Sequence, residues 1–167
     1  MPFNFSQLRV LVVDDNEFMQ RILSEVLRAI DLDPSNLRFA QDGTDALEKL
    51  GEHNTDLVFC DINMRPMNGK DFTRLVRTHP RSPNPFIPII ICTGHAEINH
   101  IYDARDAGAN EILRKPVSAG SIYGRLREVV EWPRPFIRSP TYVGPDRRRQ
   151  DQPFEGPDRR SGIAHIG

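Results

Sequence analysis

The sequence predicts an α/β protein with a doubly wound parallel sheet of five strands, five helices and an irregular C-terminal tail. Two observations favour this class. Short apolar runs alternate with amphipathic helical patterns over residues 1–131. The runs are almost continuously apolar, as in strands that helices cover on both faces. Because crossovers are right-handed, only a few topologies remain, and among them we expect the strand order 2-1-3-4-5.

The expected strands are apolar runs rich in β-branched residues, bounded by turn-forming residues. They are residues 9–13, 37–40, 56–61, 87–93 and 110–113. The expected helices repeat apolar residues every three to four positions. They are residues 18–30, residues 43–50, a helix around 72–76 that ends before Pro80, residues 96–107 closed by Gly108, and a last helix that begins at Ser118.

Composition excludes several classes of protein. The net charge of −1 argues against a surface built for nucleic acid. It conceals an acidic body, because residues 1–131 carry 15 Lys and Arg against 19 Asp and Glu, and a basic tail, because residues 132–167 carry seven Arg against four acids. No run is apolar enough for a membrane span, and the N-terminus lacks a secretory pattern. Two cysteines are too few for a disulfide framework, so we expect a cytoplasmic protein.

Polar residues that follow the strands give the main functional hypothesis. Asp14 and Asp15 follow the first strand, Asp61 ends the third, Thr93 ends the fourth and Lys115 follows the fifth. The carboxyl ends of parallel strands meet at one edge of the sheet, where ligands bind in such folds. A single Asp at a strand end is more often a turn former or a helix cap. Five polar residues at matching strand ends indicate a shared site.

Three carboxylates that converge on one crevice repel one another and favour a divalent cation. Mg²⁺ suits oxygen ligands and keeps several waters beside phosphate oxygens. Phosphoryl transfer depends mainly on positioning and charge neutralisation. A carboxylate beside a metal ion, an ammonium group and a hydroxyl therefore predicts a phosphoryl acceptor, with Asp61 as the nucleophile.

The same segments carry a resemblance to a known family. They resemble the motifs of receiver domains in bacterial two-component response regulators, which have a flavodoxin-like fold, and in particular those of single-domain regulators of the chemotaxis type. The resemblance covers about residues 7–131. The segments are Val-Val-Asp14-Asp15-Asn, Asp61-Ile-Asn-Met64, Thr93-Gly-His-Ala and Lys115-Pro116.

The resemblance implies a role for each matching residue. It implies that Asp61 is the phosphoacceptor and that Asp15, Asp61 and the backbone carbonyl of Asn63 coordinate Mg²⁺, with Asp14 assisting. It also implies that Thr93 bonds a phosphoryl oxygen, that Lys115 pairs with the phosphoryl group, and that Pro116 follows a cis peptide bond. A histidine kinase or a phosphotransfer protein would be the donor. Such domains support their own phosphotransfer and autodephosphorylation, so we do not expect a conventional enzyme.

Three positions bear on how far the family pattern applies. Arg65 stands where most receivers have proline, which is harmless variation or a feature that selects a partner. Ile112 stands at the family's aromatic switch position, so an aromatic ring cannot provide the readout. Haloacid-dehalogenase-like phosphatases also phosphorylate an Asp, but they need a second acid where this chain has Asn63, which excludes that class.

The tail, residues 132–167, is rich in proline and arginine and contains an internal repeat. The pattern aromatic-x-Gly-Pro-Asp-Arg-Arg begins at Tyr142 and again at Phe154. Each copy offers an aromatic anchor, a turn and paired guanidinium groups that suit carboxylate or phosphate. The tail could bind a partner protein or a second subunit, pack on its own acidic receiver, or be a passive disordered segment. Nucleic acid is a less favoured ligand, because four acids dilute the arginines.

Sequence alone leaves three functional hypotheses. The first is a phosphorylation-dependent switch whose output is a protein interaction, with homodimerisation as one form of it. Its partner surface would be the tail or the face formed by residues 96–107, residues 110–113 and the last helix, where Gly120 and Gly124 lie four apart. The second is a phosphate sink for a shared kinase. The third is an adaptor that acts through the tail repeat without phosphorylation.

Overall fold

The structure is a computed structural model that describes residues 4–94, 98–147 and 164–166. Its centre is a five-stranded parallel sheet in the order β2-β1-β3-β4-β5, which confirms the predicted fold class and topology. Each strand pairs with its neighbours in a parallel register, for example Asp61 opposite Cys92 between the third and fourth strands. The strands are β1 Val10–Val13, β2 Leu37–Ala40, β3 Leu57–Asp61, β4 Ile89–Thr93 and β5 Glu111–Arg114.

Five α-helices follow the five strands in turn, and short polar residues cap four of their N-termini. Asn16, Asp42, Asn68 and Ser118 accept hydrogen bonds from the first free backbone N–H groups of their helices. Two short 3-10 turns, Phe5–Gln7 and Pro34–Asn36, precede β1 and β2. The helices are α1 Glu17–Ala29, α2 Gly43–Glu52, α3 Gly69–Thr78, α4 Ile98–Ala107 and α5 Ala119–Glu131.

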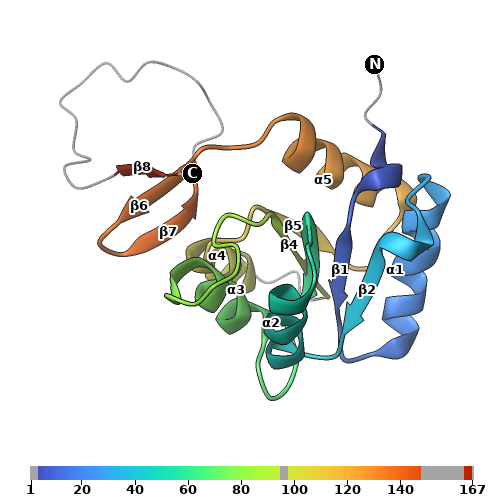
Figure 1. Ribbon diagram of the computed structural model, residues 1–167, viewed down its shortest axis with the longest axis horizontal. Helices are drawn as coiled ribbons and strands as arrows, with labels where there is room; N and C mark the ends of the chain where they lie inside the picture. Colours follow the sequence, from blue (N-terminus) through green and yellow to red (C-terminus); the bar gives the residue numbers. More distant parts are fainter. Residues whose placement is uncertain (1–3, 95–97, 148–163, 167) are drawn as a thin grey trace.

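The helices form two layers around the sheet (Figure 1). α1 and α5 cover one face, where Leu23, Leu27, Ile122 and Leu126 belong to one buried cluster with side chains of the sheet. α2, α3 and α4 cover the other face through a second buried cluster. Because the strands are parallel, their carboxyl ends all lie at one edge of the sheet. The doubly wound order therefore brings the loops after β1, β3, β4 and β5 together at that edge.

Element boundaries differ slightly from the sequence-based expectations. α1 ends at Ala29, and the chain leaves it through Asp31, which has a positive φ of 69°. α4 is described from Ile98, so the expected start of this helix at residue 96 lies outside the described residues. Gly108 closes α4 with φ 108°, as expected for a glycine at a helix end.

The tail differs from the irregular segment that we expected. β6 Phe136–Ser139 and β7 Tyr142–Pro145 form an antiparallel hairpin, and β8 Ala164–Ile166 pairs with the other side of β6. Proline-rich flanks and four-residue strands conceal this structure in the sequence, because such short strands give almost no periodic signal. The second repeat copy, residues 154–160, lies outside the described residues.

The hairpin packs on the receiver body beside α3 and α4, around the buried guanidinium of Arg77. Arg77 donates to the carbonyl oxygens of Gly108 and Pro85 and to Oδ1 of Asn110, at 2.8–2.9 Å. The ring of Phe136 in β6 lies 4.8 Å from its guanidinium carbon. Burial lowers the pKa of Arg77 to about 9, so the group stays charged at neutral pH.

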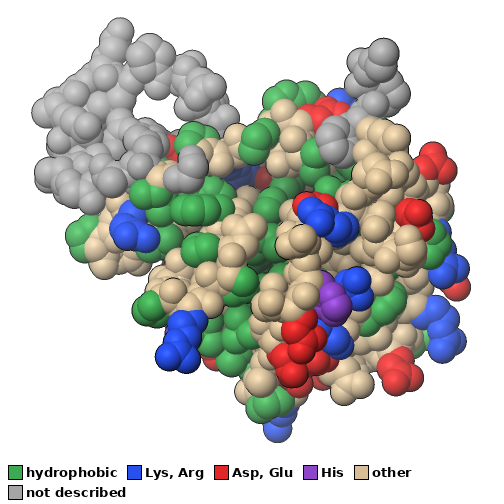
Figure 2. All heavy atoms as spheres, viewed as in Figure 1, with side chains coloured by type: hydrophobic (Ala, Val, Ile, Leu, Met, Phe, Trp, Pro, Cys, Tyr) green, Lys and Arg blue, Asp and Glu red, His purple; other side chains and the backbone are tan. Residues whose placement is uncertain are grey.

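The first repeat copy supplies several of the hairpin contacts. The Tyr142 hydroxyl is buried and donates to the Pro145 carbonyl oxygen at 2.8 Å. Arg147 stacks on the Tyr142 ring and forms an ion pair with Asp106 of α4. Hydrophobic side chains gather where the hairpin lies beside α3 and α4 (Figure 2). Residues 136–147 of the tail therefore pack on the chain's own receiver, which is one of the alternatives that the sequence left open.

None of the helices that the structure describes is both long enough and apolar enough to cross a membrane.

Candidate functional site

The structure brings the five predicted strand-end residues to one edge of the sheet. Asp14 and Asp15 follow β1, Asp61 ends β3, Thr93 ends β4 and Lys115 follows β5. Four of these strands are contiguous in the order β1-β3-β4-β5. The strand topology therefore makes the five residues neighbours, although they are far apart in the sequence.

An ammonium group lies between two of the carboxylates. Lys115 Nζ is 3.0 Å from Oδ1 of Asp61 and 3.5 Å from Oδ2 of Asp14. The side chains of Asp61 and Asp14 are only 9% and 3% exposed, and that of Lys115 is 22% exposed. Because water screens these charges poorly, they interact more strongly here than they would on an open surface.

Burial and neighbouring charges shift the titration of the site. Burial raises the pKa of Asp61, the Asp15 charge adds to this, and the Lys115 ammonium opposes it. Burial likewise raises the pKa of Asp14, again against the effect of Lys115. Burial would lower the pKa of Lys115, but the hydrogen bond and the charge of Asp61 outweigh it, so this pKa is raised. Lys115 therefore remains charged at neutral pH.

The carboxylates fit a hard divalent cation. Asp14, Asp15 and Asp61 each offer a ligand oxygen, and these oxygens lie within 4.8 Å of one another. Asp15 is exposed, so water can complete a coordination shell that the protein fills only in part. Asp15 also lines an open hollow of about 540 Å³ together with Asn63 and Arg65. The donor set and the open side suit Mg²⁺ beside a phosphate group.

Neighbouring groups from the start of α1 hold Asp14 in place. Asp14 Oδ1 accepts from the backbone N–H of Asn16 at 2.9 Å, and Asn16 itself caps α1. Gln20 on the first turns of α1 donates from Nε2 to the Asp14 carbonyl oxygen at 2.7 Å. The sequence did not indicate a role for Gln20, because a glutamine on an amphipathic helix is ordinarily expected to face solvent.

Gly69 is a second residue whose role the sequence did not reveal. A Cβ at this position would lie 2.3 Å from the carbonyl oxygen of Asp61. The Gly69 backbone N–H also donates to the Ile62 carbonyl oxygen at 3.0 Å. α3 can therefore begin directly against the end of β3 only if this residue has no side chain. The available signal was a glycine eight residues after Asp61 and shortly before the helix expected around residues 72–76.

Thr93 and Ile112 occupy neighbouring strands beside the site. Thr93 is buried, and its carbonyl oxygen accepts from the backbone N–H of Lys115 at 2.9 Å. Ile112 in β5 is partly buried against the core. The peptide bond before Pro116 is cis, as the motif predicted, and so is the one between Arg65 and Pro66.

Comparison with known proteins agrees with this geometry. The family model described as "Response regulator receiver domain" matches residues 10–127. The chemotaxis protein CheY of Pseudomonas aeruginosa is 35% identical over 124 residues, which cover 74% of this chain and 97% of that protein. CheY-3 of Vibrio cholerae is 32% identical over 74% of this chain and 92% of its own length.

Solved structures show the same fold. The structure of Vibrio cholerae CheY4 matches with a TM-score of 0.65 at 28% identity, over 74% of this chain and 98% of that one. A two-component response regulator from Clostridium difficile matches with a TM-score of 0.66 over 75% of this chain and 98% of that one, and at 20% identity it supports the fold alone. The family match and the curated relatives together show that this chain belongs to the response regulator receiver domain family.

Proposed function

We propose that this receiver accepts a phosphoryl group on Asp61 and acts as a phosphorylation-dependent switch in two-component signalling. The observation that carries the proposal is the 3.0 Å contact between Lys115 Nζ and Asp61 Oδ1, inside a cluster of three carboxylates. A lone buried ion pair would be a common structural feature. An ion pair with two further acids around it is arranged for an additional positive charge and an incoming anionic group.

The chemistry of the proposed step requires few groups. A carboxylate oxygen of Asp61 attacks the phosphorus of the donor, while the bond from phosphorus to the donor nitrogen or oxygen breaks and the leaving group keeps the electron pair. Lys115 orients Asp61 before the step and balances the charge of the phosphoryl group after it. Mg²⁺, when held by Asp14, Asp15, Asp61 and the Asn63 carbonyl oxygen, supplies charge neutralisation for the phosphoryl oxygens.

Thr93 provides the proposed readout. Its hydroxyl lies on the strand next to Asp61, at the same end of the sheet. Phosphorylation adds a charge of about −1.5 to −2, which attracts hydroxyl and ammonium donors. We expect Thr93 to move toward the phosphoryl group. Because Ile112 is aliphatic, the change must pass to α4 and β5 through small side chains.

The donor and the output follow from the same proposal. A histidine kinase or a phosphotransfer protein supplies the phosphoryl group to residues 1–131. The output is a protein interaction, either through the face formed by α4, β5 and α5 or through the appended residues 132–167, and it includes the possibility of a homodimer. Autodephosphorylation, rather than turnover of an outside substrate, returns the switch to its resting state.

The first test is the intact mass of the protein after incubation with acetyl phosphate, with Mg²⁺ or with excess EDTA. We expect wild type to gain one labile phosphoryl group only with Mg²⁺, and Asp61→Asn to gain none. No gain in folded wild-type protein would contradict a self-sufficient receiver. It would then favour the adaptor hypothesis, in which partner binding is unchanged in Asp61→Asn.

A second measurement separates a switch from a phosphate sink. The loss of phosphoryl mass after removal of acetyl phosphate gives the lifetime of the phosphorylated state. A sink predicts rapid loss and no partner that binds only the phosphorylated protein. A switch predicts such a partner and a lifetime long enough for it to bind.

A further inference from the structure

The loop between β3 and α3, residues 62–68, forms a wall of the open hollow beside Asp61. The described residues that line this hollow are Asp15, Asn63, Met64, Arg65 and Asn68. The ligand oxygens of Asp15 and Asp61 lie within 4.8 Å of each other. The hollow therefore leads from solvent to the carboxylate that would receive the phosphoryl group.

Contacts on both sides of Arg65 fix the backbone of this loop. Met64 is buried in the cluster beneath α2, α3 and α4. The backbone N–H of Gly43, at the start of α2, donates to the Met67 carbonyl oxygen at 3.2 Å. Asn68 caps the N-terminus of α3. Because Arg65 lies between these anchors, its backbone stays beside the hollow although its side chain is exposed.

The charge of Arg65 is not used by the receiver itself. Arg65 is the only cation among the described residues that line the hollow. It pairs with no acid in the part of the chain that the structure describes, although Asp15 lines the same hollow. Lys115, by contrast, contacts both Asp61 and Asp14. Mg²⁺ held by the three carboxylates would, together with Lys115, balance their charge, so the charge of Arg65 is in surplus.

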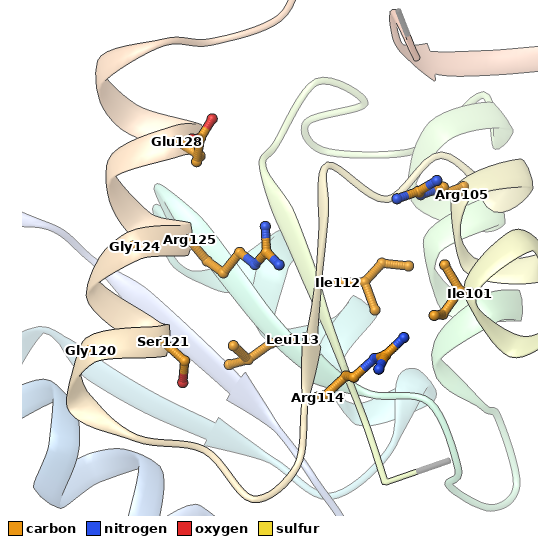
Figure 3. A pocket seen from close by; sticks show the side chains of 10 residues that line it. All are labelled: Ile101, Arg105, Ile112, Leu113, Arg114, Gly120, Ser121, Gly124, Arg125 and Glu128. Carbon is orange, nitrogen blue, oxygen red and sulfur yellow. The ribbon is translucent and has the colours of Figure 1, made fainter. Parts of the chain in front are cut away.

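Three other arginines of the receiver face a different part of the surface. Arg114 directly precedes Lys115 in the sequence, but it lines a separate groove of about 640 Å³ between α4, β5 and α5. Figure 3 shows Arg114 around that groove with Arg105 and Arg125. None of the three lines the hollow beside Asp15, where Arg65 lies.

We propose that Arg65 selects the phosphoryl donor by binding a carboxylate next to the phosphohistidine of a donor protein. Lys115 and the metal ligands already match the charge of the phosphoryl group, so a surplus guanidinium at the hollow favours a second anionic group on the donor. A guanidinium presents paired N–H donors that fit both oxygens of a carboxylate. This inference rests on the proposed phosphorylation of Asp61 and names the class of donor for it.

Two other kinds of donor fit this arrangement less well. Acetyl phosphate has no charged group besides its phosphoryl group, so Arg65 would add only a general, salt-screened attraction to it. A donor with lysines beside its phosphohistidine would bring like charges together. The hollow of about 540 Å³ is within the range of pockets that hold small ligands, so it has room for a side chain beside the imidazole ring.

The test uses the full chain and three synthetic pentapeptides whose central phosphohistidine is flanked on both sides by Glu, by Gln or by Lys. Intact mass follows phosphoryl transfer to Asp61 with Mg²⁺ at physiological salt. Affinities and amide chemical shifts for the same peptides are measured on Asp61→Asn, which lacks the acceptor carboxylate. This second readout measures the preference of Arg65 even if Asp61 is not the acceptor.

We expect wild type to accept the phosphoryl group from the Glu peptide about three- to fivefold faster than from the Gln peptide, the size of an exposed ion pair. Arg65→Gln should bring this ratio close to one, and Arg65→Glu should make the Lys peptide the fastest donor. Arg74→Gln removes an exposed arginine of α3 that does not line the hollow, and it should keep the wild-type ratio. Asp61→Asn should bind the Glu peptide with the same preference, with shifts at residues 63–68.

Each value is a ratio between peptides on one protein, so a variant that merely folds poorly cannot produce the expected reversal. A ratio of Glu to Gln rates that is equal in wild type and Arg65→Gln would overturn the proposal. An equal loss of this ratio in Arg74→Gln would also overturn it, because the preference would then reflect overall charge.

One further outcome separates this inference from the proposed function. Neither the peptides nor acetyl phosphate would label folded wild type, while Asp61→Asn would still prefer the Glu peptide and lose that preference when Arg65→Gln is added. This outcome would support the donor-binding role of Arg65 and contradict Asp61 as the phosphoacceptor.

Discussion

Lys115 is the residue on which the electrostatics of the site depend. Its ammonium group is the one cation within 3.5 Å of both Asp14 and Asp61 among the described residues. Lys115→Gln keeps a hydrogen-bond donor but removes the charge. We expect phosphorylation of Asp61 by acetyl phosphate to slow by about 10²-fold, because the lost charge would have stabilised the transferring group.

The control for this variant is Lys70→Gln, which removes a lysine from the first turn of α3. Quenched-flow or mass-based rates for both variants give the comparison. Equal rates in wild type and Lys115→Gln would remove Lys115 from the proposed mechanism.

Gly69 lies too close to the backbone of Asp61 to carry a side chain. In Gly69→Ala the new Cβ would overlap the carbonyl oxygen of Asp61, so β3 or the start of α3 must shift. We expect a loss of about 1–3 kcal/mol in unfolding free energy and slower phosphorylation of Asp61. Urea denaturation and the acetyl phosphate assay measure the two effects.

Gly51→Ala is the matched control, because a Cβ at residue 51 in α2 meets no atom within 4 Å. This variant should stabilise the protein by about 0.5–1 kcal/mol, since alanine favours a helix over glycine. If Gly69→Ala is as stable as Gly51→Ala, the close contact with Asp61 does not constrain the site.

The strands that position the site are joined at their other end by an exposed ion pair. Asp56, just before β3, accepts from the backbone N–H and the guanidinium of Arg9, just before β1, at 2.9–3.0 Å. The hydrogen bond from the Arg9 side chain lowers the pKa of Asp56 from its usual value. The ionised carboxylate therefore stabilises the folded state.

This pair predicts a defined pH dependence. A carboxyl group whose pKa is lower in the folded state stabilises the protein above its unfolded pKa of about 3.9, and the stabilisation is lost as the pH falls through the folded pKa. Asp56→Asn should cost about 0.5–1 kcal/mol at pH 7, and the difference from wild type should close in strong acid. Urea denaturation across this range measures it, and a difference that persists unchanged would exclude the carboxylate charge as its source.

At the scale of elements, the sequence predicted most of the architecture. Residues 57–60 and 89–92 are apolar throughout because both faces of the sheet are covered, and this pattern is easily distinguished from the helices. The hairpin was not predictable in the same way. Its β6 and β7 strands have four residues each, and they are stabilised by packing on α3 and α4 rather than by local propensity.

The candidate site was predictable for a related reason. Asp14, Asp61 and Lys115 lie at strand ends, and parallel topology converts that position in sequence into proximity in space. Contacts between side chains that are distant in the sequence and do not lie at strand ends could not be predicted. Arg77 is the clearest example, because an arginine on a predicted amphipathic helix is expected to face water, yet it is 2% exposed.

For the molecule as a whole, the tail is integrated with the receiver body through Arg77 and the hairpin. Tyr142 is 7% exposed, and its hydroxyl donates to the Pro145 carbonyl oxygen. Tyr142→Ala should lower the unfolding free energy by about 2–4 kcal/mol, through lost burial and an unpaired carbonyl group. Arg138→Ala, on the exposed side of β6, should have an effect within about 0.5 kcal/mol.

Chemical denaturation followed by far-ultraviolet circular dichroism and by tryptophan fluorescence compares the two variants. A single transition that shifts only in Tyr142→Ala would agree with an integrated tail. Unchanged stability in Tyr142→Ala would instead indicate that the hairpin adds nothing to the stability of the receiver body.

The central claim is that Asp61, rather than Asp14 or Asp15, receives the phosphoryl group. Borohydride reduces an aspartyl phosphate to homoserine, and peptide mass spectrometry locates that product in the chain. After treatment with acetyl phosphate and Mg²⁺, we predict homoserine at position 61 and at no other aspartate, and none when Mg²⁺ is withheld. Homoserine at position 14 or 15, or its absence from folded protein that has been fully exposed to acetyl phosphate, would contradict the account.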